Sequence, residues 1–510
     1  MEINNKMCNF AFVCKINMKQ YDKEGYNHIL KYASLFGGVQ GLIILIGLVR
    51  NKAMAWLLGA GGMGFNALLT SMQNFASQCT NLGISFGAVP RLSALYDRQQ
   101  EQQLQYNIQV IRLWSLIAAG LGIAFCVVVS PLMNRFTFTW GNHTLHYAVL
   151  ALAVAMTAIT SGEMAILKAT RRLAMVAKTQ IYTVILTLVS SVPLYYFFGH
   201  SGVLPAIVII AFLTMLVTIC YSYSCYPFRF TFRRSMLREG REMIRLGLAF
   251  VLAAAIGSAT EVAIRAFLNV EGSLDNVGLY NAAYMITITY AGLVFSAMET
   301  DYFPRLSGVA NDYEATNSLV NKQIEVSLLL LAPMLVGLMT ALPILIPLLY
   351  TGEFLPVVSM AQVAVLAMYF KVLTMPVAYI TLARRLSMSY LLLESFYFVV
   401  LMAAIVVGFR LWGLWGTGLA IVVAHLAENI VVTGYATWKY GYRTTSAVWR
   451  YAAIQMSIGA LAYAVSVLCE GWLYWITEAA LTIVSTACSL YILHQKTRLW
   501  EALMRKFKNV

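Results

Sequence analysis

Among the basic residues that lie inside long apolar stretches of the sequence, where a charge is unusual, three form one candidate group. They are Arg50, Lys52 and Arg265. A charge near the centre of a membrane-spanning helix costs roughly 2.5–3.5 kcal/mol on insertion scales, so each of these residues needs a partner or a ligand. Guanidinium groups fit phosphate oxygens, and several cations facing one cavity would bind a diffusely charged anion such as a diphosphate. The alternative is that the three side chains extend to the nearer membrane surface.

A second group of charged residues within apolar stretches could bind a coupling ion. Buried glutamate and histidine side chains commonly carry protons in transporters. The group comprises Glu163, Glu261, Lys371, Glu394, His425 and Glu428. His425 and Glu428 are three residues apart and so share a helix face, while Lys371 could be the counter-charge to one of the glutamates. The alternatives are structural hydrogen bonds between helices and, for Glu261, an ion pair with Arg265 one turn later.

Other polar residues could contact a head group or a sugar. Lys168 and Arg171 lie in a basic turn, where they could meet an anionic lipid head group or only set the topology. Gln73 and Asn74 could hydrogen-bond sugar hydroxyls or only neighbouring helices. The sequence has no Ser-His-Asp arrangement, no metal-ligand cluster and no phosphate-binding glycine loop, so neither an enzyme nor a cofactor is indicated. The expected small partner is at most a coupling H⁺ or Na⁺.

These residues must be positioned by membrane-spanning helices. The 510-residue chain is 60% hydrophobic and only 11% charged, whereas soluble domains carry about 25% charged residues. A bilayer core of about 30 Å needs about 20 mostly apolar residues per helix. Runs of that kind are found near residues 30–57, 63–88, 112–133, 145–168, 174–198, 203–226, 244–268, 276–300, 322–349, 356–382, 387–409, 412–437, 450–469 and 472–494. The sequence therefore predicts an all-α polytopic membrane protein with about 14 spans.

The basic residues indicate the topology. Most of the 36 lysines and arginines fall in alternate loops that share a side with both termini, which the positive-inside rule places in the cytoplasm. The net charge of +14 is explained in this way, so nucleic acid is not expected as a partner. Residues 495–510 predict an amphipathic tail at the membrane surface.

An internal repeat indicates two lobes. Gly64-Phe-Asn-Ala recurs as Gly278-Leu-Tyr-Asn-Ala, and Pro90-Arg-Leu-Ser recurs as Pro304-Arg-Leu-Ser, both with an offset of 214 residues. Six predicted spans separate the copies, so the repeat is parallel, and Arg265 falls at the repeat equivalent of residue 51. Carriers with such repeats rock one lobe against the other around a central cavity. The expected parts are a cytoplasmic segment 1–29, a first lobe 30–226, a basic inter-lobe loop 227–243, a second lobe 244–440, a helix pair 450–494 and the tail 495–510.

Several ordered residues resemble the polysaccharide flippases of the Wzx type, in the superfamily that includes the multidrug (MATE) exporters and the lipid II flippase. The segment from Lys52 to Gly64 is similar to the family pattern K-x-x-A-x-x-x-G-P-x-G-x-G. The similarity continues at Arg265, Val277-Gly278-Leu279-Tyr280, Pro304, Leu306-Ser307, Lys371, Tyr379, Ala383, Tyr390 and Glu394. Two departures are Ala60 in place of the proline and Ala367-Met368 in place of a Gly-Asp pair. The last two spans exceed the twelve that are usual for O-antigen flippases.

The resemblance implies a transporter of the bacterial inner membrane. Its cargo would be oligosaccharide repeat units linked to undecaprenyl diphosphate, which it would move to the outer leaflet. The units would serve surface polysaccharides such as the O-antigen of lipopolysaccharide. Lys52, Lys168, Arg171 and Arg265 match positions thought to engage the diphosphate and sugars, and an ion gradient would drive the cycle. A polysaccharide polymerase and a chain-length regulator are the partners that the resemblance implies. The alternatives are a lipid II flippase, a drug/cation antiporter of the same fold, and a membrane-embedded glycosyltransferase or polymerase, for which the outer loops are short.

Overall fold

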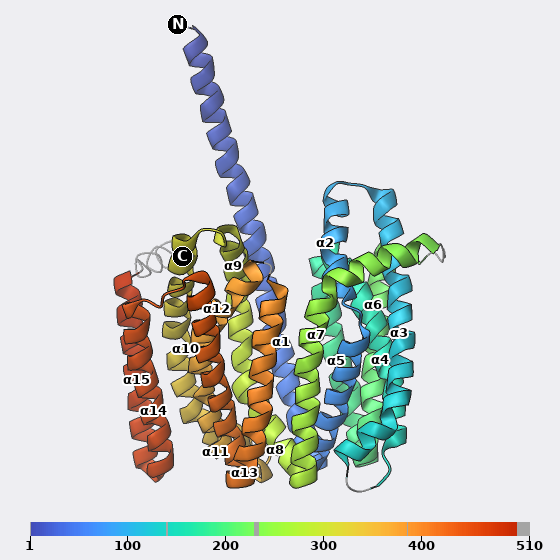
Figure 1. The fold of residues 1–510 in the computed structure, drawn as a ribbon, viewed down its shortest axis with the longest axis vertical. Coiled ribbons are helices and arrows are strands. Elements are labelled where there is room, and N and C mark those ends of the chain that lie inside the picture. Colours follow the sequence, from blue (N-terminus) through green and yellow to red (C-terminus); the bar gives the residue numbers. More distant parts are fainter. Residues whose placement is uncertain (1, 139–140, 229–233, 385, 497–510) are drawn as a thin grey trace.

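The computed structural model describes residues 2–138, 141–228, 234–384 and 386–496, and these residues form helices joined by short turns (Figure 1). In chain order the elements are α1 (Glu2–Thr80), α2 (Ile84–Asp97), α3 (Glu101–Thr137), α4 (Thr144–Ala169), α5 (Leu173–Phe198), η1 (Gly199–Gly202), α6 (Val203–Cys225), α7 (Arg234–Glu271), α8 (Leu274–Tyr284), η2 (Met285–Tyr290), α9 (Ala291–Val309), α10 (Tyr313–Leu349), η3 (Gly352–Phe354), α11 (Val357–Val365), α12 (Ala367–Ala383), α13 (Ser387–Tyr440), α14 (Ser446–Leu468) and α15 (Gly471–Lys496).

The helices account for every predicted span. Ten helical segments of the described chain are long and apolar enough to cross a membrane. Three of them hold two predicted spans each, namely Val39–Thr80, Leu173–Cys225 and Ser387–Tyr440. The remaining predicted span, 276–300, coincides with α8, η2 and α9, which are outside these ten segments. Within α1 the chain turns back at Gly59 (φ 65°), and within α13 it turns back at Gly413 (φ 59°). Only glycine adopts such positive φ angles without strain, so the chain reverses there with almost no loop. The prediction of an all-helical polytopic membrane protein is confirmed.

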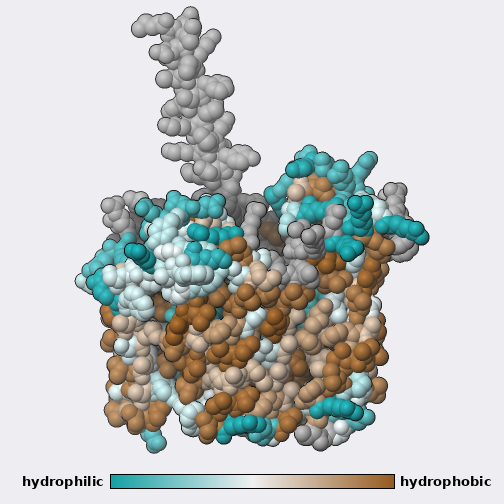
Figure 2. Space-filling view, in the orientation of Figure 1, coloured by the Kyte–Doolittle hydropathy of each residue, from teal (hydrophilic) through white to brown (hydrophobic). Residues whose placement is uncertain are grey.

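The helices form two groups and an outer pair (Figure 1). In the first group α4 packs on α3 and α6, and α5 packs on α1 and α6. In the second group α13 packs on α11 and α12, and α10 packs on α11 and α12. Helices α14 and α15 pack against α10 at the edge of this second group. On the face shown in Figure 2, a predominantly hydrophobic band lies between hydrophilic residues gathered at both ends, as is typical of a membrane-spanning protein.

The two copies of the sequence repeat meet where α1 crosses α8. A Cβ atom added at Gly64 would lie 2.0 Å from the carbonyl oxygen of Leu274, and one added at Gly278 would lie 2.0 Å from the carbonyl oxygen of Ala60. The two backbones are therefore in direct contact, which only residues without a side chain allow. Both contacts join residues of the repeat, because 60 and 274, like 64 and 278, are 214 positions apart. This crossing closes one end of the bundle between the two lobes.

The connection between the lobes differs from the expected loop 227–243, because α7 begins at Arg234. Its first turns pack on α2 and α3, where Met236 is buried. Arg91 of α2 forms an ion pair with Glu239 at 2.8 Å, and the indole Nε1 of Trp114 donates a hydrogen bond to the Met236 carbonyl oxygen at 3.1 Å. Burial of an apolar face on the first lobe favours helix over loop here. The linker is thereby attached to the first lobe before the chain enters the second.

Candidate functional site

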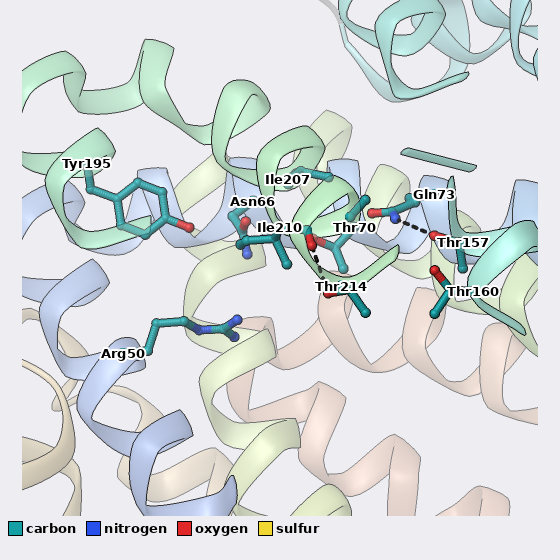
Figure 3. A pocket seen from close by; sticks show the side chains of 11 residues that line it. Arg50, Asn66, Thr70, Gln73, Thr157, Thr160, Tyr195, Ile207, Ile210 and Thr214 are labelled. Atoms are coloured by element: carbon teal, nitrogen blue, oxygen red, sulfur yellow. Dashed lines mark hydrogen bonds between the residues drawn. The ribbon is translucent and has the colours of Figure 1, made fainter. Parts of the chain in front are cut away.

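A cavity of about 250 Å³ lies within the first lobe. Four helices line it, and both halves of α1 contribute because the turn at Gly59 brings them together. Figure 3 shows the lining side chains, which extend from α1, α4, α5 and α6 toward the same space. The lining residues are Arg50, Asn66, Thr70, Gln73, Thr157, Thr160, Tyr195, Ile207, Ile210, Ala211 and Thr214. Most of the wall is therefore uncharged but able to form hydrogen bonds.

Arg50 brings the positive charge to this cavity. Its Nη2 donates a hydrogen bond of 3.4 Å to the Asn51 side-chain oxygen, while its Nε is buried with no hydrogen-bond partner. None of the lining residues is acidic, and none of the ion pairs found among the described residues involves Arg50. A guanidinium group with an unused N–H in a partly buried site favours an anionic ligand.

Three of the four threonines of the cavity wall present oxygen acceptors. Thr157 and Thr160 each donate their hydroxyl hydrogen to the carbonyl oxygen four residues earlier, both at 2.8 Å, and Thr214 does the same at 2.7 Å. The Nε2 of Gln73 donates to the Thr157 hydroxyl at 3.3 Å. Because the hydroxyl hydrogens of these three threonines are already used, the lone pairs of their oxygens are what remains for a ligand. Such a wall accepts hydrogen bonds from hydroxyl groups.

The expected grouping of Arg50 with Lys52 and Arg265 is not found in this structure. Lys52 is exposed, and its Nζ donates to the Leu348 carbonyl oxygen of α10 at 2.5 Å. Arg265 is buried and forms an ion pair with Glu261 at 3.1 Å, as the one-turn spacing suggested. Of these three cations, only Arg50 lines the first-lobe cavity.

The remaining predicted head-group and sugar residues are dispersed. Lys168 is exposed near the end of α4. Arg171, in the turn after α4, adopts a positive φ of 55° and pairs with Asp97 at 2.8 Å. Gln73 lines the cavity, but its neighbour Asn74 is exposed and lies outside the lining.

Glu163 is held in a buried ion pair that the sequence pattern did not reveal. Arg112 of α3 donates from Nε and Nη2 to the two Glu163 carboxylate oxygens at 2.8 and 3.2 Å, and both side chains are only 3% exposed. The Ser222 hydroxyl donates to the same carboxylate at 2.5 Å, and the guanidinium stacks 4.4 Å from the centre of the Tyr223 ring. This network ties α3, α4 and α6 together, so Glu163 has a structural role in this state. The signal in the sequence was an arginine at the edge of one predicted span and a glutamate within the next.

Four of the other five coupling candidates gather in the second lobe, and the fifth, Glu261, pairs with Arg265. The Nδ1 of His425 and a carboxylate oxygen of Glu428 lie 2.9 Å apart. The Nε2 of His425 lies 3.3 Å from the Tyr397 hydroxyl. The Tyr397 and His425 rings stack with their centres 4.8 Å apart. Lys371 of α12 interacts electrostatically with both Glu394 and Glu428. These residues form one cluster across α12 and the two halves of α13, which we name the second-lobe cluster. Tyr397 was missed, although its spacing of three residues from Glu394 places both on one helix face.

A family model for a polysaccharide biosynthesis protein matches residues 53–359, which is more than half of the chain. The chain belongs to this polysaccharide biosynthesis family. The match begins in the Lys52–Gly64 segment and extends to α11, so it includes most of the lining of the first-lobe cavity and the α1–α8 crossing. No curated protein matches the chain.

Solved structures of a lipid flippase and of MATE transporters of the MOP superfamily share the fold of this family member. The lipid II flippase MurJ in an inward closed conformation is 13% identical, with a TM-score of 0.70 over 91% of this chain and 99% of MurJ. A MATE-family multidrug resistance transporter in an inward-facing conformation is 15% identical, with a TM-score of 0.61 over 78% of this chain and 94% of that one. An outward-facing MATE structure gives 14% identity and a TM-score of 0.57 over 80% and 95% of the two chains. The chain is therefore a transporter-fold membrane protein of the polysaccharide biosynthesis family.

Proposed function

We propose that this protein is a flippase for polyprenyl-diphosphate-linked oligosaccharides. It would move repeat units from the cytoplasmic to the outer leaflet of a bacterial inner membrane by alternating access, with both termini in the cytoplasm. Membership of the polysaccharide biosynthesis family and the MurJ-like fold support a role with lipid-linked saccharides. The two lobes, which meet at the close crossing of α1 and α8 among other contacts, have the arrangement in which one lobe can rock against the other.

The observation that carries the proposal is the chemistry of the first-lobe cavity. It combines Arg50, which has an unused N–H, with a wall of amide and hydroxyl groups and no lining carboxylate. A drug/cation antiporter would instead favour an acidic or aromatic cavity, because its cargo is cationic. Arg265 and Lys52 lie near the lobe interface, where a change between inward and outward states would alter their partners and expose them to a diphosphate.

The second-lobe cluster is the proposed coupling site. It places a histidine, two glutamates and a lysine within one region of the bundle. In such a cluster the binding of one H⁺ changes which groups pair, and a change in pairing between helices can bias the two states of a carrier. Replacement of His425 by glutamine is expected to abolish the dependence of transport on a pH gradient while the protein remains folded.

A lipid II flippase is the second candidate, because the MurJ structure aligns over 99% of its own length. The two candidates differ in cargo. Loss of an oligosaccharide flippase leads to accumulation of lipid-linked repeat units of a surface polysaccharide. Loss of a lipid II flippase leads to accumulation of the peptidoglycan precursor. A polysaccharide polymerase and a chain-length regulator would be partners of the first kind of protein.

The test combines a deletion strain with a purified-membrane assay. We expect the deletion to abolish surface polysaccharide and to trap intact lipid-linked repeat units in the inner leaflet. We expect Arg50→Gln, expressed to the normal level, to reproduce that defect. The matched control is Arg450→Gln, because Arg450 is an exposed arginine of α14 away from the cavity. Normal polysaccharide in the deletion strain, or repeat units already exposed on the outer leaflet, would refute the proposal.

A further inference from the structure

We infer that the first-lobe cavity is a subsite for one acidic sugar ring, such as a hexuronic acid, of the transported repeat unit. The inference rests on the proposed function and adds the class of sugar that the cavity selects. It follows from the charge, the hydrogen-bonding polarity and the size of the cavity, which are taken in turn.

The charge of the cavity suits a monoanion. Arg50 is the one cationic residue of the described lining, and Asn51 satisfies only one of its N–H groups, at a long 3.4 Å. The buried Nε has no protein partner. The Nε and Nη edge of a guanidinium matches the two oxygens of a carboxylate. A carboxylate placed there would satisfy the buried donor and neutralise the charge.

The hydrogen-bonding polarity of the wall suits a hydroxylated ring. Thr157, Thr160 and Thr214 donate to backbone carbonyls, so their oxygens can only accept from a ligand in this geometry. A sugar hydroxyl can donate to such an oxygen, whereas the ionised diphosphate link of a lipid-linked saccharide has no hydrogen to donate and would meet oxygen lone pairs. Figure 3 shows these threonines on the side of the cavity away from Arg50. The ligand therefore needs an anionic end and a hydroxyl-bearing end.

The size of the cavity suits one ring. Its volume is about 250 Å³, and it is partly open to the outside. That space has room for a single sugar ring with its carboxylate. The remaining sugars of the repeat unit would lie outside this subsite.

The test measures the binding of small probes to the purified full-length protein in detergent, by isothermal titration calorimetry. The probes are D-glucuronate, D-glucose, acetate and inorganic phosphate. We expect glucuronate to bind at least tenfold more tightly than each of the other three. Equal or tighter binding of glucose, acetate or phosphate, or no binding of glucuronate, would overturn the inference.

Two variants test the two ends of the ligand separately. Arg50→Gln is expected to remove the preference for glucuronate over glucose, and Thr160→Val to weaken glucuronate binding several-fold while acetate binding is unchanged. Thermal melting in the same detergent identifies variants that are folded. Arg50→Lys keeps the charge and is expected to retain part of the preference for glucuronate over glucose. A folded Arg50→Gln protein that still prefers glucuronate would refute the assignment, and Arg450→Gln should behave as wild type.

Transport separates failure of this inference from failure of the proposed function. In vesicles, the wild-type protein is given lipid-linked oligosaccharides with and without a uronic acid. Transport of either cargo together with no preference among the small probes would overturn the acidic-sugar subsite and leave the flippase proposal standing. Transport of neither cargo would overturn the flippase proposal itself.

Discussion

Replacement of Gly64 by alanine should open the end of the bundle that the α1–α8 crossing closes. The added Cβ would lie 2.0 Å from the Leu274 carbonyl oxygen, whereas ordinary contacts begin near 3.4 Å, so the backbones must separate by about 1.4 Å. Overpacking of this kind costs about 1–3 kcal/mol. The cost applies only to the closed arrangement, so the population ratio of open to closed molecules should rise about 5- to 150-fold.

The assay is a spin-label distance measurement on the full chain. Labels at Asn142 and Leu355, introduced as cysteines in a background without native cysteines, lie on exposed positions of the first and second lobes. We expect Gly64→Ala to increase the fraction of long distances. Gly278→Ala should do the same, because a Cβ there meets the Ala60 carbonyl oxygen at the same 2.0 Å.

The control variant is Gly47→Ala, which lies in the same helix with nothing within 4 Å of the added Cβ. It makes the same change in helix propensity without the overlap. If Gly64→Ala and Gly47→Ala gave the same distance distribution as wild type, the assignment of the crossing as the closing contact would be wrong.

Three further predictions concern stability. Glu163→Gln leaves the buried charge of Arg112 without a carboxylate and should lower the free energy of unfolding by about 3–5 kcal/mol. Arg171→Gln breaks an exposed ion pair and should lower it by about 1 kcal/mol or less. Equal melting temperatures of the two variants in detergent would contradict this contrast. Burial and a neighbouring histidine lower the pKa of His143 below its usual 6.5, so the folded state resists protonation more than the unfolded state; its stabilising contribution is present above about pH 6.5 and is lost as the pH falls. The melting temperature should therefore fall between pH 8 and pH 5. An identical fall in a His143→Gln protein would contradict the role given to His143. Glu478 is fully buried and accepts a hydrogen bond of 3.0 Å from a threonine of α10. Because no ion pair of the described residues includes Glu478, Glu478→Gln should change the free energy of unfolding by about 1 kcal/mol or less. A large fall in the melting temperature would reveal a charge-dependent role.

The helices and the repeat could be predicted because they depend on local pattern. Apolar runs of sufficient length determine the spans, and the 214-residue offset between matching segments identifies the two lobes. The start of α7 at Arg234 could not be predicted in the same way, because its first turns are favoured by burial of Met236 on helices that are distant in sequence.

The candidate site was predicted less completely because it depends on which helix faces meet. Position in the repeat suggested that Arg50 and Arg265 share a cavity, but Arg265 pairs with Glu261, one helical turn away, at 3.1 Å and is not in the lining of the first-lobe cavity. Glu163 was grouped with the coupling residues because its partner, Arg112, is 51 positions away and belongs to another helix. Residues on one helix, such as His425 and Glu428, were paired correctly because their contact is local.

The α1–α8 crossing has the geometry of a contact between two identical subunits. Residue 60 contacts residue 278 and residue 64 contacts residue 274. Each copy of the repeat therefore contacts the other through the same, equivalent surface. That reciprocity is the signature of an isologous interface about a two-fold axis. A half-length ancestor with this segment would associate with a second copy of itself through the same surface. Fusion of the two copies into one chain removes the concentration dependence of that association, and afterwards each half is able to change its own cavity independently.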